Sequence, residues 1–360
     1  MRSALQVFAG PVARARLAER GLQPSDIAAI PAAAGGPKGL ILNGLDRHLF
    51  AHWLPRSQHS VHLLGASIGA WRMATACLPG DADAHFRAMA EAYVGQRYDP
   101  EPGRQRPSAA GVSAKFARTL AACFGGQEGA LLQHARWRLH VVTSRGRGPL
   151  LRREGRWRTP LGYLGAFATN ALHRPWLGAW LERVVFSDGR TPLGVDWRDF
   201  RTQRVDLSEA NLLPSLLASC SIPFWLQAQA DLPGAPPGSY WDGGITDYHL
   251  HWDYRPLQHS ASPLVLYPHF QPQVVPGWLD KAWKRRHRPS AFLDNLVLLV
   301  PHPDWVRRLP GGKLPDRSDF TDLGVDERQR RWRAAVADSQ RLADDFAHLS
   351  AQSSVHALPL

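Results

Sequence analysis

Two apolar runs near the start of this chain are each followed at once by a glycine-rich turn. Residues 26–32 lead into Gly-Gly-Pro-Lys-Gly at positions 35–39, and residues 61–64 lead into Gly-Ala-Ser-Ile-Gly at positions 65–69. A helix is expected after each turn. Short buried strands that alternate with helices are typical of a parallel sheet covered by helices. The sequence therefore predicts an α/β fold of three layers, α/β/α, around a mainly parallel central sheet.

The remainder of the chain carries elements of the same kinds, with no internal repeat and no linker that would divide it. Helices are expected over 12–21, 40–53, 70–78 and 327–349, strands over 138–144 and 264–268, a loop over 99–111, and an apolar helix within 212–226 that breaks at 221–223. The 360 residues are expected to form a single domain. A motif-bearing core of about 25–255 is followed by a C-terminal elaboration over 256–360.

Composition excludes several classes of protein. Hydrophobic residues make up 44% and charged residues 21% of the chain, which excludes disorder as the main state. No apolar stretch reaches the length of about 18 residues that a membrane-spanning helix needs, and the N-terminal segment lacks the apolar run of a secretory signal. A cytoplasmic protein is expected. Cys77, Cys123 and Cys220 are odd in number and far apart, which excludes a disulfide framework and a C-x-x-C metal site. Small buried hydrophobic side chains are expected there instead.

The net charge is less ordinary. Basic residues outnumber acidic ones by 43 to 31, for a formal net charge of +12, and only five of the basic residues are lysine. A positive field of this size attracts anionic partners such as phospholipid surfaces, nucleic acid or acidic substrates. A bias in genomic base composition would also give many scattered arginines. Both interpretations of the charge stay open at this stage.

The pentapeptide at 65–69 fits the pattern G-x-S-x-G, with Ser67 at its centre. That spacing suits a sharp turn from a strand into a helix, where the glycines let the backbone pass close to its neighbours and the serine stays exposed. The helix dipole and the free N–H groups at the helix N-terminus favour negative charge near the serine. The pattern is short, but it follows an apolar strand directly. Ser67 is therefore a candidate nucleophile, with a structural turn as the alternative.

The loop at 35–39 also joins a strand to a helix, so its backbone N–H groups are candidates to bind an oxyanion or a phosphate. The loop matches neither G-x-x-x-x-G-K-[ST] nor G-x-G-x-x-G, which excludes two common nucleotide-binding loops. Pro37 has no N–H. The candidate donors are therefore Gly35, Gly36, Lys38 and Gly39, with a plain tight turn as the alternative.

Asp242-Gly243-Gly244 is a common turn by itself, but it is the third of three features in a fixed order. A glycine-rich loop follows the first strand, G-x-S-x-G follows the second, and Asp-Gly-Gly comes some 175 residues later. In this order the motifs resemble the patatin-like phospholipase family. The segment Ala218-Ser219-Cys220-Ser221-Ile222-Pro223 is similar to the family's Ala-Ser-x-x-x-Pro segment. The resemblance covers about residues 25–255.

The resemblance implies a lipid acyl hydrolase of the phospholipase or carboxylesterase type. Ser67 would be the nucleophile, Asp242 its general base in a dyad without histidine, and the 35–39 loop the oxyanion hole. An acyl-enzyme would form and then be hydrolysed, and neither a metal nor an organic cofactor is expected to take part. This chain departs from the family where Ala33-Ala34 replaces Asp-Gly, where Lys38 replaces arginine, and at Pro37.

The expected partners are a lipid or small ester substrate and, peripherally, an anionic membrane surface. The segment 278–288 carries two tryptophans and five basic residues, which suits such an interface or a solvated basic turn. Nucleic acid is not an expected partner, and the sequence does not indicate an oligomeric state.

Several alternatives remain open at this stage. Asp247, His249, His251 and Asp253 would share one face of a strand, where they could ligate zinc or iron, or be solvated side chains. His249 or His251 could instead complete a Ser-His-Asp triad. A non-lipid esterase or an acyltransferase would use the same dyad. A basic protein that binds membrane or nucleic acid through a degenerate hydrolase site would carry the same motifs.

Overall fold

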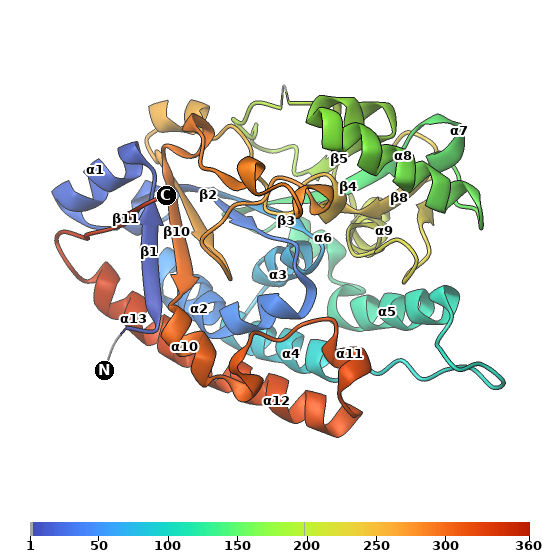
Figure 1. The fold of residues 1–360 in the computed structure, drawn as a ribbon. Coiled ribbons are helices and arrows are strands. Elements are labelled where there is room, and N and C mark those ends of the chain that lie inside the picture. The colour runs from blue at the N-terminus through green and yellow to red at the C-terminus, as the bar shows by residue number, and fades with distance from the viewer. Residues whose placement is uncertain (1–2, 198) are drawn as a thin grey trace.

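The centre of the molecule is one mixed sheet (Figure 1). The computed structural model describes residues 3–197 and 199–360. In these residues the strands are β1 (Leu5–Ala9), β2 (Ile27–Ala32), β3 (Val61–Ala66), β4 (Trp137–Gly146), β5 (Leu181–Ser187), β6 (Thr202–Asp206), β7 (Gln229–Ala230), β8 (Ser239–Asp242), β9 (Leu264–Pro268), β10 (Leu296–Pro301) and β11 (Leu358–Pro359). Every residue of β2, β3, β5, β9 and β10 is buried, as in strands that are covered on both faces.

The strands in the middle of the sheet are parallel. The strand order is β11-β1-β10-β9-β2-β3-β4-β5-β6, and each pair of neighbours from β10 to β4 runs parallel. β1 and β5 border this block in the antiparallel direction, and β8 pairs antiparallel with β4. The predicted α/β fold with a mainly parallel sheet is confirmed. β9 and β10 come from the last third of the chain and lie between β2 and β1, so residues beyond 255 form part of the main sheet.

Helices cover the sheet on both sides. The α-helices are α1 (Pro11–Arg20), α2 (Asn43–His48), α3 (Ile68–Ala76), α4 (Ala82–Val94), α5 (Ala109–Phe124), α6 (Glu128–Leu132), α7 (Gly148–Leu151), α8 (Arg158–Leu172), α9 (Glu209–Ser219), α10 (Pro303–Arg308), α11 (Asp319–Asp322), α12 (Val325–Asp338) and α13 (Gln340–Ser350). In Figure 1, α2, α3, α4, α12 and α13 lie below the sheet, whereas α7 and α8 lie above it at the right.

The expected long helix over 327–349 is wrong, because α12 and α13 are separate helices that meet at Ser339. The Ser339 hydroxyl donates a 2.6 Å hydrogen bond to the Val336 carbonyl and accepts a 3.0 Å bond from the Gly44 N–H. A Cβ on Gly44 would lie 2.6 Å from the Ser339 carbonyl oxygen. Helix α2 therefore meets the junction in direct backbone contact, which a pattern of local periodicity does not reveal.

The strands β3 and β8 bring distant parts of the chain to one point. β3 runs beside β4 until Ala66 lies opposite Val142, and there β3 turns away at Ser67. The next residue of β4, Thr143, lies opposite Asp242 at the end of the antiparallel strand β8. β8 therefore takes the place of β3 beside β4, and Ser67 and Asp242 meet where one strand gives way to the other.

Among the described residues, none of the helices combines the length and the apolar composition that crossing a bilayer requires.

Candidate active site

Ser67 occupies the turn between β3 and α3 in a strained conformation. Its φ is 56° and its ψ is −128°, a region that residues other than glycine rarely adopt. A Cβ on Gly65 would lie 2.4 Å from the Cα of Ala70, and a Cβ on Gly69 would lie 2.0 Å from the carbonyl oxygen of Ala32. Only glycine at these two positions lets the turn pack this closely against α3 and β2. The strand-to-helix turn that the sequence predicted is present.

Asp242 ends β8 with its carboxylate facing Ser67. The Ser67 hydroxyl donates a 2.8 Å hydrogen bond to Oδ2 of Asp242, and the Gly244 N–H donates a 2.7 Å bond to Oδ1. Ser67 is 4% and Asp242 5% exposed, so the bond between them lies in a water-poor setting. This contact is the geometry that a carboxylate needs to take a proton from a serine.

The surroundings of Asp242 affect how readily it accepts a proton. Burial raises the pKa of its carboxyl above the usual range, because the ionised form loses hydration. The charge of Arg317 and the hydrogen bonds from Ser67 and Gly244 act against this increase. A carboxylate with a raised pKa is a stronger base toward the serine hydroxyl. Burial also raises the pKa of the neighbouring Cys220 thiol well above its ordinary value, which keeps that thiol protonated.

The segment after α9 holds both dyad residues in place. Oγ of Ser219 accepts a 2.9 Å hydrogen bond from the Ser67 N–H and donates a 2.7 Å bond to the carbonyl of Val142. The carbonyl of Ser221 accepts a 2.9 Å bond from the Asp242 N–H. The sequence analysis identified the segment 218–223 only by resemblance. The structure shows a positioning role for it, because it ties the strained turn and the end of β8 to β4.

The loop after β2 continues into a 3₁₀ helix, η2 (Gly36–Leu42), which packs beside the Ser67 turn. In a 3₁₀ helix each N–H bonds to the carbonyl three residues before it, so the amides from Lys38 onward belong to the helix itself. In the part of the chain that the structure describes, no backbone partner is found for the N–H groups of Gly35 and Gly36. A Cβ on Gly39 would lie 3.1 Å from Ile68, the residue after Ser67. Gly35 and Gly36 are therefore the free amides among the four candidates.

Arg317 and Lys38 place two cations at this loop. A Cβ on Gly36 would lie 3.2 Å from Nε of Arg317, so the guanidinium lies directly against the loop. Nζ of Lys38 forms a 3.3 Å ion pair with Asp316. Within residues 3–197 and 199–360, Arg317 has no carboxylate within ion-pair distance. The loop thus carries one guanidinium that is free to meet an anionic group.

Lys281 is a third cation near the dyad, close enough for its charge to act on the pKa of Asp242. Its ammonium lies 4.1 Å from the centre of the Tyr248 ring, and that ring lies beside Gly244. Desolvation of the ammonium, together with the charges of Lys38 and Arg317, lowers the pKa of Lys281 to about 8. Lys281 is nevertheless exposed.

The four candidate ligands at 247–253 do not lie on a strand, which is the arrangement that would have placed them on one face. The segment is irregular, with a bend at 248–249 and an isolated bridge between Asp253 and Asp196, and Asp247 belongs to a buried network. Arg183 donates hydrogen bonds of 2.6 and 2.7 Å to its two carboxylate oxygens, and Trp252 donates a third of 2.6 Å. Among the described residues, no group of three or more His, Cys, Asp or Glu side chains is arranged to hold a metal ion.

The two histidines of this segment have other partners. Nδ1 of His249 lies 2.9 Å from the N–H of Val275, and a ring nitrogen of His251 lies 3.3 Å from the hydroxyl of Ser290. In the described chain neither ring forms a hydrogen bond with Ser67 or Asp242. Burial lowers the pKa of both histidines, to about 4 for His251, so both rings are neutral at pH 7.

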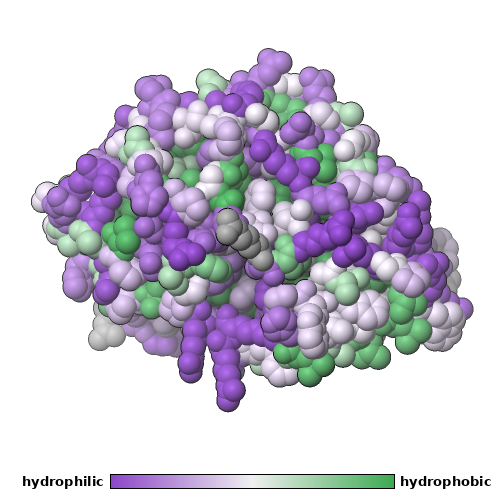
Figure 2. All heavy atoms as spheres, turned by 90° about the horizontal axis from the view of Figure 1, so that it is seen from above, coloured by the Kyte–Doolittle hydropathy of each residue, from purple (hydrophilic) through white to green (hydrophobic). Residues whose placement is uncertain are grey.

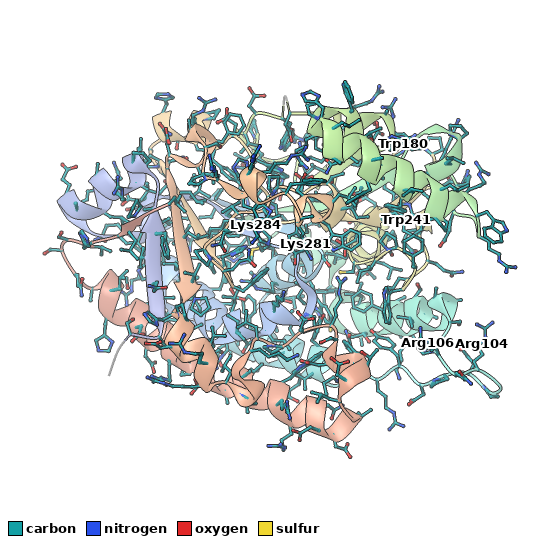
Figure 3. All side chains as sticks on the ribbon, in the orientation of Figure 1. Arg104, Arg106, Trp180, Trp241, Lys281 and Lys284 are labelled. Atoms are coloured by element: carbon teal, nitrogen blue, oxygen red, sulfur yellow. The ribbon has the colours of Figure 1, made fainter. Side chains whose placement is uncertain are left out.

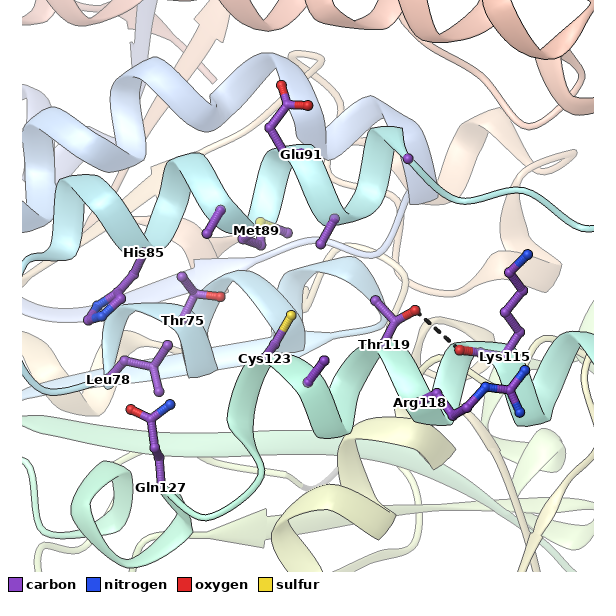
Figure 4. Close-up of a pocket in the computed structure, with 14 residues that line it drawn as sticks. Thr75, Leu78, His85, Met89, Glu91, Lys115, Arg118, Thr119, Cys123 and Gln127 are labelled. Carbon is purple, nitrogen blue, oxygen red and sulfur yellow. Dashed lines mark hydrogen bonds between the residues drawn. The ribbon is translucent and has the colours of Figure 1, made fainter.

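A groove of ≈ 720 Å³ lies between α4 and α5 and does not reach the dyad (Figure 4). Met89 and Cys123 contribute to its walls, and Thr119 donates a 3.2 Å hydrogen bond to the Lys115 carbonyl along one side. Burial raises the pKa of the Cys123 thiol, which disfavours the reactive thiolate. The groove is separate from the candidate active site.

Sequence reasoning missed three residues of the site. Ser219 belonged to a recognised segment, but nothing local showed that its hydroxyl would bond to the Ser67 N–H. Lys281 was interpreted only as part of a basic surface segment. Arg317 lies in a stretch with no motif, and only the path of the chain between β10 and α12 brings it to the dyad. Residues that reach a site from a distant loop leave no signal in a local pattern.

Comparison with known proteins gives limited similarity. No protein-family model matches the chain, and no curated protein sequence matches it. Among solved structures, the chain is similar to VipD from Legionella pneumophila, with 12% identity, a TM-score of 0.35, and coverage of 95% of this chain and 70% of that one. It is also similar to human GIVD cytosolic phospholipase A2, with 14% identity, a TM-score of 0.34, and coverage of 92% and 60%. A third is the type III effector protein ExoU, with 13% identity, a TM-score of 0.34, and coverage of 97% and 60%. The chain thus spans less than two thirds of the length of the last two proteins, and the roles of its residues rest on its own geometry.

Proposed function

We propose that this protein hydrolyses acyl esters of lipids through an acyl-enzyme on Ser67. The observation that carries the proposal is the 2.8 Å hydrogen bond between the strained Ser67 and the buried Asp242. A serine with a strained backbone, a carboxylate of raised pKa and a helix N-terminus are found together at sites of nucleophilic attack. The order of the motifs, which resembles the patatin-like phospholipases, supports the same assignment.

In the first half-reaction, the Ser67 hydroxyl attacks the ester carbonyl carbon while Asp242 takes its proton. The carbonyl oxygen becomes an oxyanion, for which the free amides of Gly35 and Gly36 are the nearest candidate donors. Collapse of the tetrahedral intermediate breaks the bond to the alcohol, which leaves with the proton held by Asp242. Water then attacks the acyl-enzyme in the same manner, with Asp242 again as base, and the carboxylic acid is released.

The cations near the dyad favour an ester that carries an anionic group. Arg317 at the loop and Lys281 over Tyr248 both lie close enough to Asp242 for their charges to act on its pKa. Neither is paired with a carboxylate within the described residues. A phosphate a few bonds from the scissile ester, as in a phospholipid, would meet these cations, whereas a neutral ester would leave them unused.

A panel of esters tests the proposal. Wild type and Ser67→Ala are assayed with a soluble short-chain ester, a neutral acylglycerol and a phospholipid. We expect turnover that Ser67→Ala lowers by roughly 10³-fold or more, with the phospholipid preferred. His251→Gln serves as the control, because His251 is close in sequence to the dyad aspartate but bonds elsewhere. Turnover of the soluble ester alone would support the dyad but contradict a lipid substrate. Turnover that survives in Ser67→Ala would contradict the assignment of Ser67 as the nucleophile.

A further inference from the structure

Helix α8 is apolar on the face that it turns to solvent as well as on the face that it buries. Its inner face contributes Tyr163 and Ala166 to a buried cluster with Trp241, and Trp241 and Trp180 lie beside the helix in Figure 3. Its outer face carries side chains that are 41% to 76% exposed, namely Leu161, Leu164, Phe167 and Leu172. The only charged residue among its 15 is Arg158. A helix on the surface of a globular protein ordinarily turns a polar face to water, so this face is expected to meet a second apolar medium.

The apolar area continues from α8 onto its neighbours. Of the twelve exposed large apolar side chains in the described residues, ten lie on α8 or on segments next to it. The six that lie outside the helix are Trp157, Trp176, Phe224, Trp225, Trp278 and Trp283. Ring contacts of 5.8 Å between Tyr163 and Phe224 and of 6.4 Å between Phe167 and Trp283 link the helix to them. We refer to these ten side chains as the α8 surface.

Figure 2 shows the molecule from above, with hydrophobic and pale side chains gathered at the lower right, on the side where α8 lies in Figure 1. Exposed apolar side chains that are scattered singly need no explanation. A contiguous group that is rich in tryptophan and phenylalanine, with basic side chains at its border, marks an interaction surface.

Phe224, which belongs to the α8 surface, is exposed by a strained backbone. Its φ is 70°, in the left-handed region that a bulky residue rarely adopts, and the residue is 59% exposed. It directly follows the segment 218–223, which holds the dyad. A strained backbone that exposes an aromatic ring next to a catalytic site is typical of a functional constraint.

Basic side chains border the α8 surface at both ends. Arg152, Arg156 and Arg158 lie at the start of α8, and Lys284, Arg285 and Arg288 follow Trp283; all six are exposed. None of the six forms an ion pair within the described residues, whereas the nearby Arg286 is bound at 2.7 Å to the buried Asp280. Aromatic rings between unpaired cations suit the boundary between anionic headgroups and acyl chains.

We propose that the α8 surface adsorbs to an anionic lipid surface and so brings the dyad to its substrate. The surface is linked to the dyad through the Tyr163 ring, which lies 5.8 Å from the Phe224 ring and 5.9 Å from the ring of Trp241, the residue before Asp242. A second copy of the chain is a poorer occupant, because a symmetric dimer through this surface would place two cationic rims against each other. The role in catalysis rests on the proposed function, whereas adsorption itself does not need an active dyad.

Flotation of the full chain with vesicles tests the proposal. The vesicles are phosphatidylcholine with or without phosphatidylserine, and every variant carries Ser67→Ala so that hydrolysis does not alter the vesicles. We expect binding to the anionic vesicles, and roughly tenfold weaker binding for Leu161→Gln/Leu164→Gln, because two exposed leucines lose their apolar contact. Val12→Gln is the matched apolar control, since Val12 is exposed on α1.

The charge is tested in the same assay. Lys284→Gln/Arg285→Gln is expected to weaken binding roughly tenfold or more, and added salt should reduce this difference. Arg330→Gln/Arg333→Gln removes the same charge from α12, on the other side of the sheet, and should leave binding nearly unchanged. Arg104 and Arg106, on the loop before α5 in Figure 3, provide a second pair for the same comparison.

Three results would overturn the proposal. The first is equal binding of wild type and Leu161→Gln/Leu164→Gln. The second is equal binding to neutral and anionic vesicles. The third is a dimer in sedimentation that these leucine substitutions dissociate, because a second copy would then cover the surface. Turnover of soluble esters by Leu161→Gln/Leu164→Gln in an otherwise wild-type chain is expected to stay unchanged. If the wild-type chain binds vesicles but hydrolyses no ester, the proposed function is contradicted and the proposed adsorption is still supported.

Discussion

The dyad and the α8 surface are linked through Tyr163 and are built in opposite ways. At the dyad, the Ser67 N–H and hydroxyl both have buried partners, and glycine stands where a side chain would collide with the backbone. On the α8 surface, large apolar side chains are exposed to solvent and contact mainly one another and neighbouring side chains. The difference teaches that placing two reacting groups needs many directional contacts, whereas contact with a lipid needs mainly apolar area. The residues around the dyad should therefore be intolerant of small changes, and the surface should tolerate polar substitutions without unfolding.

The largest effect is expected from the dyad itself. Asp242→Asn should lower kcat nearly as much as Ser67→Ala, by roughly 10³-fold or more, and the double variant should be little worse because the two residues act as a unit. Ester turnover by the purified variants measures this. If the effects of the Asp242 and Ser67 substitutions multiply in the double variant, the two residues do not act as a unit. Full activity in Asp242→Asn would likewise contradict the assignment of Asp242 as the general base.

The packing of the turn predicts the next largest effect. Gly69→Ala places a Cβ 2.0 Å from the Ala32 carbonyl oxygen, whereas Gly324→Ala meets nothing within 4 Å. We expect Gly69→Ala to lower the free energy of unfolding by about 1–3 kcal/mol or more and to reduce activity, because the backbone must shift. Gly324→Ala should change stability little. Denaturant unfolding of both variants measures the difference. Equal free energies of unfolding for Gly69→Ala and Gly324→Ala would contradict the close packing of the turn at Gly69.

The pH dependence tests the electrostatics around Asp242. The general base must be ionised, so kcat/KM falls as pH falls through its pKa. Burial raises that pKa, so the acid limb should lie above pH 4, near which an ordinary carboxyl titrates. Arg317→Gln removes a charge that lowers this pKa, so the limb should move to higher pH. If the acid limb of Arg317→Gln stays in place or moves to lower pH, the charge of Arg317 does not lower the pKa of Asp242.

The smallest expected effect concerns backbone strain. Ser67→Gly and Ser67→Ala both remove the hydroxyl, but only glycine adopts a φ of 56° and a ψ of −128° without strain. Ser67→Gly is therefore expected to be more stable than Ser67→Ala by about 1 kcal/mol. Thermal unfolding of the two inactive variants measures this. Greater stability of Ser67→Ala would mean that the turn is not strained.

Sequence analysis was most informative where one short segment fixes both structure and chemistry. The elements around Ser67 were predictable because an apolar strand, two glycines and a helix lie within a few residues of each other. The importance of Asp242 came from the order of three motifs, since Asp-Gly-Gly alone is a common turn. The meeting of Ser67 and Asp242 depends on β8 taking the place of β3 beside β4, which no local pattern encodes.

The misses have a shared physical cause in long-range contacts. The break at Ser339 comes from contact with Gly44, and the irregular chain around Asp247 comes from its bonds to the distant Arg183. Helix α8 was not predicted, because its two apolar faces hide the periodicity that marks a surface helix. Arg317 reaches the dyad only through the tertiary fold.

Labelling with a fluorophosphonate, followed by mass measurement and peptide mapping, tests the central claim most directly. This probe reacts with an activated serine and needs no knowledge of the substrate. We expect one adduct per chain on Ser67, its absence in Ser67→Ala, and much slower labelling in Asp242→Asn. A folded wild-type chain that stays unlabelled, or that carries the adduct on another residue, would contradict the account.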